Sequence, residues 1–473
     1  MSEVKKIKPS LSKGTRDFLP SEVAKRNYIF DTIKTVFRKY GFEEIETPAI
    51  ERLETLTGKY GEEGDKLLFK ILNSGDYLKD VPKEELAVGN SQLATKYIAE
   101  KGLRYDLTVP LARYVVQHQD DLAFPFKRFH IGPVWRADRP QKGRYQEFYQ
   151  CDADVIGSNS IINEIELLMI YLEVFERLSL KVTVKINHRA ILKVLAEQGG
   201  ISVEMFATIL DKLDKVGLDS VLDELNAVGY RLKMNDLLQQ FIQGTHSKQV
   251  HQFENYFNGT WGFEDKATNE KIVINSNEAI KACLDVAKVI NSSELHEEGS
   301  RHNLVQFDLT LARGLNYYTG IIWEVVANNV QMGSIASGGR YDNLTEMFGG
   351  QNMSGVGISF GIERIYDVME ELNLFPETIS QGVKVLFVPR DQSVEEFTFQ
   401  QVQQLRDANI PAEIFLGNVK KQKQFNYTEQ KNIAYLVEVG ENEVQSGKFR
   451  LRNTKTRDTQ NDITVSEIIQ KLS

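Results

Sequence analysis

The ten residues from Leu311 to Gly320 bring a cation, two aromatic hydroxyls and two glycines into one short segment. Arg313 stands directly before Gly314, and a guanidinium beside a flexible glycine suits close approach to an anion. Tyr317 and Tyr318 follow. If the segment is a strand, their side chains point to opposite faces, so one hydroxyl can face a pocket. An ordinary aromatic edge strand would explain the same pattern.

A second group of polar side chains lies on a predicted antiparallel hairpin. Residues 124–136 follow a strand pattern that ends in Arg136, a basic loop comes next, and strand alternation resumes over 145–154. Gln150, Asp152 and Asp154 share one face of the returning strand because side chains alternate with period 2. Such a face meets either solvent, the usual case, or a polar ligand. The adjacent Arg136 favours a phosphate-bearing ligand.

A third stretch, residues 355–366, predicts a strand that turns into a helix across glycines. Arg364 falls in the first helical turn, where the helix dipole favours anions, although a surface arginine is the common alternative. The glycine spacing differs from a dinucleotide fingerprint, and no suitable βαβ unit surrounds it. The sequence contains no Walker A motif and no G-x-S-x-G elbow, so any ATP would bind without a P-loop.

Composition excludes several classes of protein. The 473 residues are 41% hydrophobic, which suits two to four globular domains. No apolar run approaches the roughly 20 residues that cross a bilayer, and no secretory signal is apparent, so we expect a cytoplasmic protein without a membrane partner. Two cysteines cannot form a disulfide framework, and the seven histidines lack metal-ligand spacing. No metal site built from protein side chains is therefore expected.

Charge is unevenly distributed along the chain. The net charge of -9 argues against indiscriminate binding of nucleic acid. Residues 127–144 nevertheless carry six basic side chains and one acid. Such a patch is compatible with a polyanion bound at a chosen place, although a solvated surface is the more common explanation.

The elements that would position these residues fall into three parts. Residues 189–301 read mostly as helices between the strands predicted at 182–187 and 304–309. This order suggests an insertion into a sheet domain, and the alternative is another part of one domain. From Val383 onward, strands and helices alternate, which predicts a small α/β domain with a partly parallel sheet.

Taken together, these segments resemble the class II aminoacyl-tRNA synthetases, and specifically the histidyl-tRNA synthetase family. Residues 41–51, 129–154 and 355–364 are similar to the three class II motifs in order and spacing. The segments similar to the histidine enzymes in particular are 311–320 and 336–342, and residues 104–110 are similar to the family's amino-acid loop. The match spans nearly the whole chain, with one departure at Asn316, where the family usually has aspartate.

The resemblance implies an α+β fold, with an antiparallel catalytic sheet flanked by helices. The implied domains are a catalytic core in two parts, a mostly helical insertion that contacts the tRNA acceptor arm, and a C-terminal α/β anticodon-binding domain. Their expected ranges are 1–188 and 303–376 for the core, 189–302 for the insertion and 383–473 for the C-terminal domain. Motif 1 further implies a homodimer.

The resemblance also implies a role for each matching residue. The catalytic pair would be Arg136 and Arg313, gripping the α-phosphate of ATP from opposite sides. Asp106 and Gln150 would hold the α-amino group of histidine, and Asp154 and Tyr318 would read its imidazole. The full implied histidine-binding set is Asp106, Leu107, Thr108, Arg136, Gln150, Asp154, Arg313, Tyr317 and Tyr318. The implied ATP-binding set is Arg136, Arg144, Tyr145, Arg313 and Arg364, and Gln141 and Arg144 would contact the tRNA acceptor stem.

The implied reaction is ATP-dependent formation of histidyl-adenylate, followed by transfer of histidine to tRNA(His), with Mg²⁺ accompanying the ATP. The alternative is a synthetase-like, histidine-sensing regulatory subunit. Such paralogues tend to lose the ATP-binding arginines and the C-terminal domain, whereas Arg136, Arg313 and Arg364 are present here. A different class II synthetase is disfavoured by the two histidine-type segments at 311–320 and 336–342.

Overall fold

A computed structural model describes most of the chain, in two compact units. The described residues are 8–58, 61–82, 91–210, 212–230, 261–264, 271–274, 277–292, 304–312, 318–343, 345–376, 379, 382–417 and 421–473. The first unit takes in the residues up to Arg16 together with Ile29–Leu374, and the second takes in Asp17–Tyr28 and Phe375–Ser473. None of the described helices is long and apolar enough to cross a membrane.

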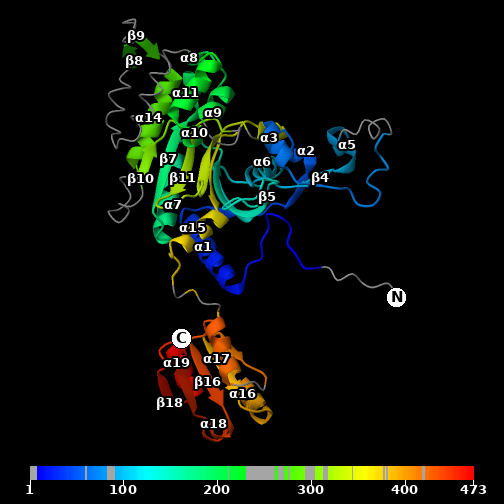
Figure 1. Cartoon of the computed structure of the whole chain (residues 1–473), viewed down its shortest axis with the longest axis vertical. Coiled ribbons are helices and arrows are strands. Elements are labelled where there is room, and N and C mark those ends of the chain that lie inside the picture. Colours follow the sequence, from blue (N-terminus) through cyan, green and yellow to red (C-terminus); the bar gives the residue numbers. More distant parts are fainter. Residues whose placement is uncertain are drawn as a thin grey trace. The chain divides into compact units, whose positions relative to one another are not determined.

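An eight-stranded sheet organises the first unit (Figure 1). Its strands, in spatial order, are β1 (Glu43–Glu44), β5 (Phe126–Trp135), β6 (Glu147–Ile156), β13 (Gly355–Gly361), β12 (Ala336–Tyr341), β11 (Ile321–Ala327), β7 (Val182–His188) and β10 (Leu304–Phe307). The strands from β5 to β7 run antiparallel, and the edge strands β1 and β10 pair in parallel with their neighbours. The predicted hairpin over 124–154 and the predicted strands near 182, 304 and 355 are confirmed.

Three helices cover the apolar face of this sheet: α1 (Pro20–Lys39, from Ile29 onward), α7 (Ile162–Arg177) and α15 (Ile362–Glu371). Aromatic rings of the helices pack against an aromatic ring of the sheet. Phe360 on β13 lies 5.9 Å from Phe37 of α1, 5.1 Å from Tyr171 and 5.5 Å from Phe175 of α7, measured between ring centroids. Each such pair adds about 0.5–1.5 kcal/mol beyond its area burial. The opposite face is therefore the one left for ligands.

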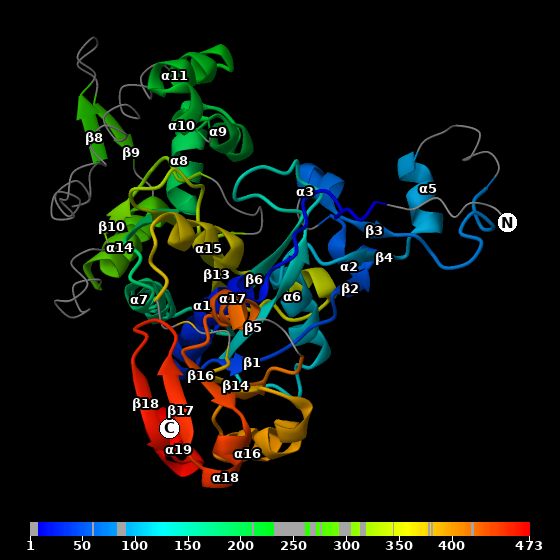
Figure 2. The same cartoon turned by 60° about the horizontal axis from the view of Figure 1, so that its bottom comes forward.

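Smaller elements lie toward the two ends of the sheet (Figure 2). A three-stranded sheet comprises β2 (Ile50–Arg52), β4 (Lys101–Leu103) and β3 (Lys70–Ile71), accompanied by α2 (Leu53–Leu56), α3 (Gly61–Leu67), α5 (Ser91–Ile98) and α6 (Thr108–Gln117). Between β7 and β10 come α8 (Arg189–Gly199), α9 (Val203–Leu210), α10 (Leu213–Val216), α11 (Leu218–Ala227), the hairpin of β8 (Trp261–Glu264) and β9 (Lys271–Ile274), and α14 (Asn277–Ser292). The helices were predicted and the hairpin was not.

The second unit holds a five-stranded sheet in the order β15 (Ala412–Ile414), β14 (Val385–Pro389), β16 (Tyr435–Val439), β17 (Phe449–Asn453) and β18 (Thr459–Ile463). Its first three strands are parallel and the rest antiparallel, as predicted for a small α/β domain. Its helices are α16 (Glu395–Asp407), α17 (Lys421–Gln430), α18 (Glu441–Ser446) and α19 (Val465–Leu472). Phe387, Val402, Val437 and Ile468 pack in one core.

The prediction of a strand over Leu311–Gly320 is wrong for the residues described there. Strand β11 begins only at Ile321, and Leu311, Ala312, Tyr318 and Thr319 lie outside strands. The Asn187 side chain explains why, because its Nδ2 donates to the carbonyl oxygens of Leu309 at 3.2 Å and Leu311 at 2.9 Å. A buried side chain, rather than a neighbouring strand, satisfies this backbone.

Candidate active site

The uncovered face of the eight-stranded sheet is polar where β5, β6 and β13 meet. Directly paired residues of neighbouring strands point to the same face, so the register defines rows of side chains across the sheet. The rows are Arg128, Asp154 and Gly357; His130, Asp152 and Ser359; and Gly132, Gln150 and Gly361. Glycine is required at 357, since a Cβ there would overlap the Asp154 carboxylate.

Asp154, predicted to read the imidazole, is held by two side chains that were not predicted. Its Oδ2 lies 2.6 Å from Nη2 of Arg128, and its Oδ1 accepts a 2.6 Å hydrogen bond from the Tyr341 hydroxyl. Burial raises the pKa of Asp154, while the Arg128 cation acts in the opposite direction. The carboxylate is thus fixed in place with a cation behind it.

Arg128 corrects the interpretation of the basic patch over residues 127–144. Its side chain is fully buried, so this member of the patch cannot meet a polyanion at the surface. The sequence did carry a signal for it, because Arg128, His130 and Gly132 alternate on one face of an otherwise apolar strand. A polar face on each of two paired strands marks a buried polar layer.

The residues of the amino-acid loop reach the same region from the start of α6. Asp106 is buried, and its Oδ1 accepts a 3.1 Å hydrogen bond from the backbone amide of Val109. The Leu107 carbonyl accepts from Arg128 Nη2 at 3.4 Å, which ties the loop to β5. Leu107 is itself fully buried, so it can meet a ligand only through its backbone. Thr108, the first residue of α6, is also buried.

Three predicted arginines converge at the other end of the hairpin. Burial lowers the pKa of Arg364, and the positive charges of Arg144 and Arg136 lower it further, which places the three guanidiniums near one another. Arg364 donates from Nε to the Gly143 carbonyl at 2.7 Å and from Nη1 to the Ser334 carbonyl at 2.5 Å. Such a concentration of cations favours a polyanion.

The amino-acid loop, residues 104–110, orients the side chain of Arg136. Its Nε donates to the Tyr105 carbonyl at 3.1 Å, and its guanidinium carbon lies 4.3 Å from the centre of the Tyr105 ring. Within the described part of the chain this is the only hydrogen bond of its side chain, so its two terminal nitrogens remain available to an anion.

The other predicted loop residues differ in what they can offer a ligand. Gln141 and Arg144 are exposed and close the loop through paired backbone hydrogen bonds of 3.1 and 2.9 Å. The Tyr145 hydroxyl donates to Asp367 at 2.8 Å and accepts from Arg16 at 2.9 Å, and burial raises the pKa of Tyr145 to about 12. Tyr145 would therefore meet a ligand through its ring or backbone.

Arg313 and Tyr317 lie outside the described residues, as does Asn316. Tyr318 is described, and it packs in the apolar cluster that contains Tyr341. A Cβ on Gly339 would stand 2.7 Å from the Tyr318 ring, so the glycine lets the ring approach β12. Tyr318, Tyr341 and Asp154 thus gather around one part of the polar face.

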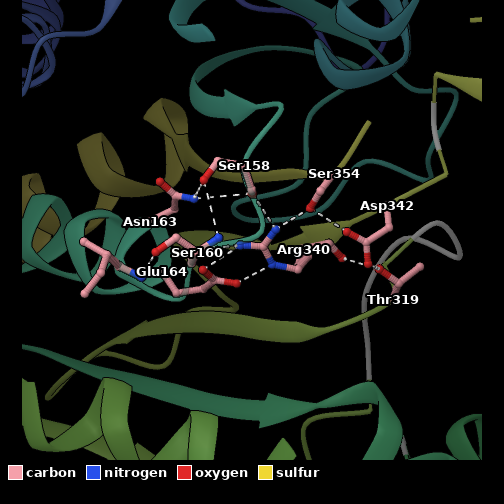
Figure 3. A network of polar contacts seen from close by, with 9 residues as sticks. Ser158, Ser160, Asn163, Glu164, Thr319, Arg340, Asp342 and Ser354 are labelled. Atoms are coloured by element: carbon pink, nitrogen blue, oxygen red, sulfur yellow. Dashed lines mark hydrogen bonds and ion pairs between the residues drawn. The ribbon is translucent and has the colours of Figure 1, made fainter. Parts of the chain in front are cut away.

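A polar network centred on Arg340 fixes the backbone beside Tyr318 (Figure 3). The Arg340 guanidinium is paired with Glu164 of α7 at 2.5 and 2.7 Å and donates to the Ser354 hydroxyl at 2.5 Å. Ser354 donates to Asp342, whose other oxygen accepts a 2.6 Å hydrogen bond from the Thr319 hydroxyl. The Thr319 amide also donates to the Arg340 carbonyl at 2.8 Å.

This network predicts a measurable effect of Thr319→Val. Loss of the bond to Asp342 loosens the residue next to Tyr318. For the histidine-dependent ATP–pyrophosphate exchange that the resemblance implies, we therefore expect the KM for histidine to rise about three- to tenfold, with little change in kcat. Thr456→Val is the matched control, since this exposed threonine makes the same 2.6 Å bond to Asp458 in the second unit. Equal KM values in Thr319→Val and the wild type would contradict the positioning role.

His130 predicts a pH-dependent stability. Burial, followed by the charges of Arg128 and Arg104, lowers the pKa of His130 from 6.5 to about 3. The unfolded chain therefore binds a proton at a pH where the folded chain does not, and stability falls as the pH drops from 6.5 toward 3. At pH 4.5 the loss is about 2–3 kcal/mol.

We expect His130→Gln to remove this contribution. Urea unfolding at pH 7.5 and pH 4.5 should therefore show a smaller loss of stability on acidification in the variant than in the wild type. An equal loss in both proteins would contradict the buried, neutral state of His130.

Comparisons with known proteins agree over nearly the whole chain. The family model described as histidyl-tRNA synthetase matches residues 14–78 and 99–365, and the model described as anticodon binding domain matches residues 383–473. The histidine–tRNA ligase of Bacteroides fragilis (strain YCH46) is 48% identical over 471 residues, covering 98% of this chain and 99% of that protein.

Solved structures give the fold. The histidyl-tRNA synthetase of Nostoc sp. PCC 7120 superposes with a TM-score of 0.79 at 27% identity, covering 99% of each chain. An ATP phosphoribosyltransferase regulatory subunit/histidyl-tRNA synthetase from Bacillus halodurans C is similar in fold, with a TM-score of 0.68 at 19% identity over 92% of this chain and 99% of that one.

The antiparallel sheet with its flanking helices and the C-terminal α/β sheet together have the α+β fold of a class II aminoacyl-tRNA synthetase. The near full-length matches are more specific than the fold. The chain belongs to the histidyl-tRNA synthetase family.

Proposed function

We propose that the chain is a histidine–tRNA ligase, which activates L-histidine with ATP and transfers it to the 3'-terminal ribose of tRNA(His). The observation that carries the proposal is that the β5–β6 hairpin has arginines in its loop and polar side chains along β6. Arg136 and Arg144, in the loop after β5, lie near Arg364, and β6 continues from that loop along the polar face that carries Gln150 and Asp154. An anion site and an amino-acid site therefore adjoin.

The proposed roles follow from this arrangement. Arg136 and Arg364 bind the ATP phosphates, and Arg313 approaches the α-phosphate from the opposite side. Asp106, Thr108 and Gln150 hold the α-amino group of histidine, with Leu107 supplying backbone contacts. Asp154, Tyr317 and Tyr318 surround the imidazole. Arg144 and Tyr145 border the ATP, and Gln141 and Arg144 contact the acceptor stem.

Activation joins a histidine carboxylate oxygen to the α-phosphorus while the bond to the β-phosphate breaks and pyrophosphate leaves. Two anions about 4 Å apart repel by roughly 4 kcal/mol at an effective dielectric near 20. Guanidiniums on both sides offset that repulsion and stabilise the transition state. Mg²⁺ would accompany the ATP phosphates and contribute in the same sense. A ribose hydroxyl of tRNA then attacks the acyl carbon, and AMP leaves.

The remaining parts of the proposal concern partners and domains. The core comprises residues 1–188 and 303–376. Residues 189–302 form an insertion, which is supported by the parallel pairing of β7 with β10 on either side of it. This insertion contacts the acceptor arm. Residues 383–473 read the anticodon, in keeping with the family model matched there. The enzyme acts as a homodimer through motif 1, in the cytoplasm.

A histidine-sensing regulatory subunit is the alternative, and the likeness to the Bacillus halodurans protein extends to the fold alone. The cluster of Arg136, Arg144 and Arg364 argues against it, because sensing histidine requires no polyphosphate site.

Charging of tRNA tests the proposal. The purified chain, ATP, labelled histidine and tRNA(His) should yield acid-precipitable histidyl-tRNA. Histidine binding without any charging or adenylate formation would instead support the regulatory alternative.

A further inference from the structure

Asp152 is a buried carboxylate in the middle of the polar face, and the roles proposed above do not use it. Its side chain is 2% exposed. It lies on β6 between Gln150 and Asp154, and all three residues share one face of the strand. Because a strand rises about 3.4 Å per residue, the outer two are roughly 14 Å apart. A ligand that spans from Gln150 to Asp154 must therefore pass over Asp152.

The Ser359 hydroxyl fixes the orientation of both neighbours. Gln150 Nε2 donates to Ser359 Oγ at 2.8 Å, and the single hydroxyl proton of Ser359 is then free to go to Asp152, its other hydrogen-bond partner. The amide nitrogen of Gln150 is used in this chain of bonds, so its oxygen points elsewhere. Gln150 Oε1 and Asp152 Oδ1 are both buried and have no hydrogen-bond partner among the described residues.

Two acceptor atoms without a hydrogen-bond partner, on adjacent rows of one face, are expected to receive hydrogen bonds from a ligand. One acceptor belongs to a carboxylate, so a positively charged donor is favoured over a neutral one. An ammonium group has three N–H donors and can serve both acceptors at once, whereas each ring nitrogen of a neutral imidazole carries one proton at most.

The surrounding charges agree with a cationic ligand. The carboxylates that act on Asp152 are Asp154 and Asp106, and the guanidiniums are Arg128 and Arg104. Three carboxyl groups face two guanidiniums, so full ionisation of the three would leave the region one positive charge short. Burial raises the pKa of Asp152 to about 7, with Arg128 acting in the opposite direction. An incoming cation would favour the ionised form of Asp152.

We propose that Asp152 is a further substrate-binding residue, whose Oδ1 accepts a hydrogen bond from the α-ammonium group of the amino-acid substrate together with Gln150 Oε1. Ser359 is the positioning residue that aims both acceptors. This inference rests on the proposed function, because it takes histidine to be the amino acid that lies along β6.

The test compares two ligands that differ in the ammonium group alone. Binding of L-histidine and of 3-(imidazol-4-yl)propanoate, which lacks the α-amino group, is measured by calorimetry on the full chain. We expect Asp152→Asn to weaken histidine binding about 10- to 100-fold, the range for a charge-assisted hydrogen bond, and to leave the affinity of the analogue within about twofold. Glu173→Gln is the control, since this buried carboxylate lies on α7 over the opposite face; both affinities should stay unchanged.

Equal weakening of both ligands in Asp152→Asn would overturn the proposal, because Asp152 would then act on the imidazole or on the fold. Unchanged binding of histidine in Asp152→Asn would overturn it as well. Ser359→Ala provides a second route if Asp152→Asn does not fold. It should weaken histidine about three- to tenfold and spare the analogue, and equal affinities for histidine in Ser359→Ala and the wild type would also count against the proposal. A wild-type chain that binds no histidine would refute the proposed function itself, which is a separate outcome.

Discussion

Arg136→Gln is expected to lower the kcat of histidine-dependent ATP–pyrophosphate exchange by about 10²- to 10³-fold. The terminal nitrogens of Arg136 are free to meet charge that develops on the α-phosphate, and removing one such preorganised donor has an effect of this size. The KM for histidine should change less than kcat, because the loss falls mainly on the transition state. Steady-state exchange kinetics measure both parameters.

Arg139→Gln is the matched control, because Arg139 is an exposed arginine of the same loop. It should retain exchange within about twofold while thermal unfolding of both variants stays close to that of the wild type. Full exchange activity in Arg136→Gln would remove Arg136 from the catalytic pair and would weaken the assignment of the arginine cluster to ATP.

Arg128→Met is expected to lower the free energy of unfolding of the first unit by about 3–5 kcal/mol. The change removes the cation 2.6 Å from Asp154 and leaves a buried carboxylate without its counter-charge, which is strongly destabilising. Urea titration followed by tryptophan fluorescence measures the loss. Lys127→Met is the control, since this neighbouring lysine forms a part-exposed ion pair with Glu166 and should contribute about 1 kcal/mol or less.

A second substitution separates charge from packing at the same place. Asp154→Asn added to Arg128→Met removes the unpaired charge, and Tyr341 can still donate to the amide oxygen, so the double variant should be more stable than Arg128→Met alone. If the double variant is as unstable as the sum of the two single variants, the pair is not coupled, and the buried ion pair does not explain how the polar face is held.

Much of the fold follows from local patterns in the sequence. The hairpin of β5 and β6, the strand-to-helix turn before Arg364 and the alternating elements after Val383 were all predictable, because each depends on side-chain periodicity within a few tens of residues. The strand expected over Leu311–Gly320 was wrong for the residues described there, because the Asn187 side chain, more than 100 positions earlier in the sequence, donates to the carbonyls of Leu309 and Leu311 at the start of that segment. No pattern within the segment itself predicts such a contact.

The site shows the same division. The polar alternation on β6 identified Gln150 and Asp154, since period 2 is local. The partners of Asp154, namely Arg128 and Tyr341, depend on strand register and on the pairing of segments far apart in the sequence. Charge counting misplaced Arg128 at the surface, because composition does not distinguish a paired, buried guanidinium from a solvated one.

The measurement that tests the central claim most directly is ATP–pyrophosphate exchange with each of the twenty amino acids in turn. A site that hydrogen-bonds the polar groups of its substrate can reject analogues lacking them by roughly 10⁴–10⁵-fold. The account therefore predicts exchange with histidine and none above background with the other nineteen. Exchange driven by a different amino acid, such as proline or threonine, but not by histidine would contradict it.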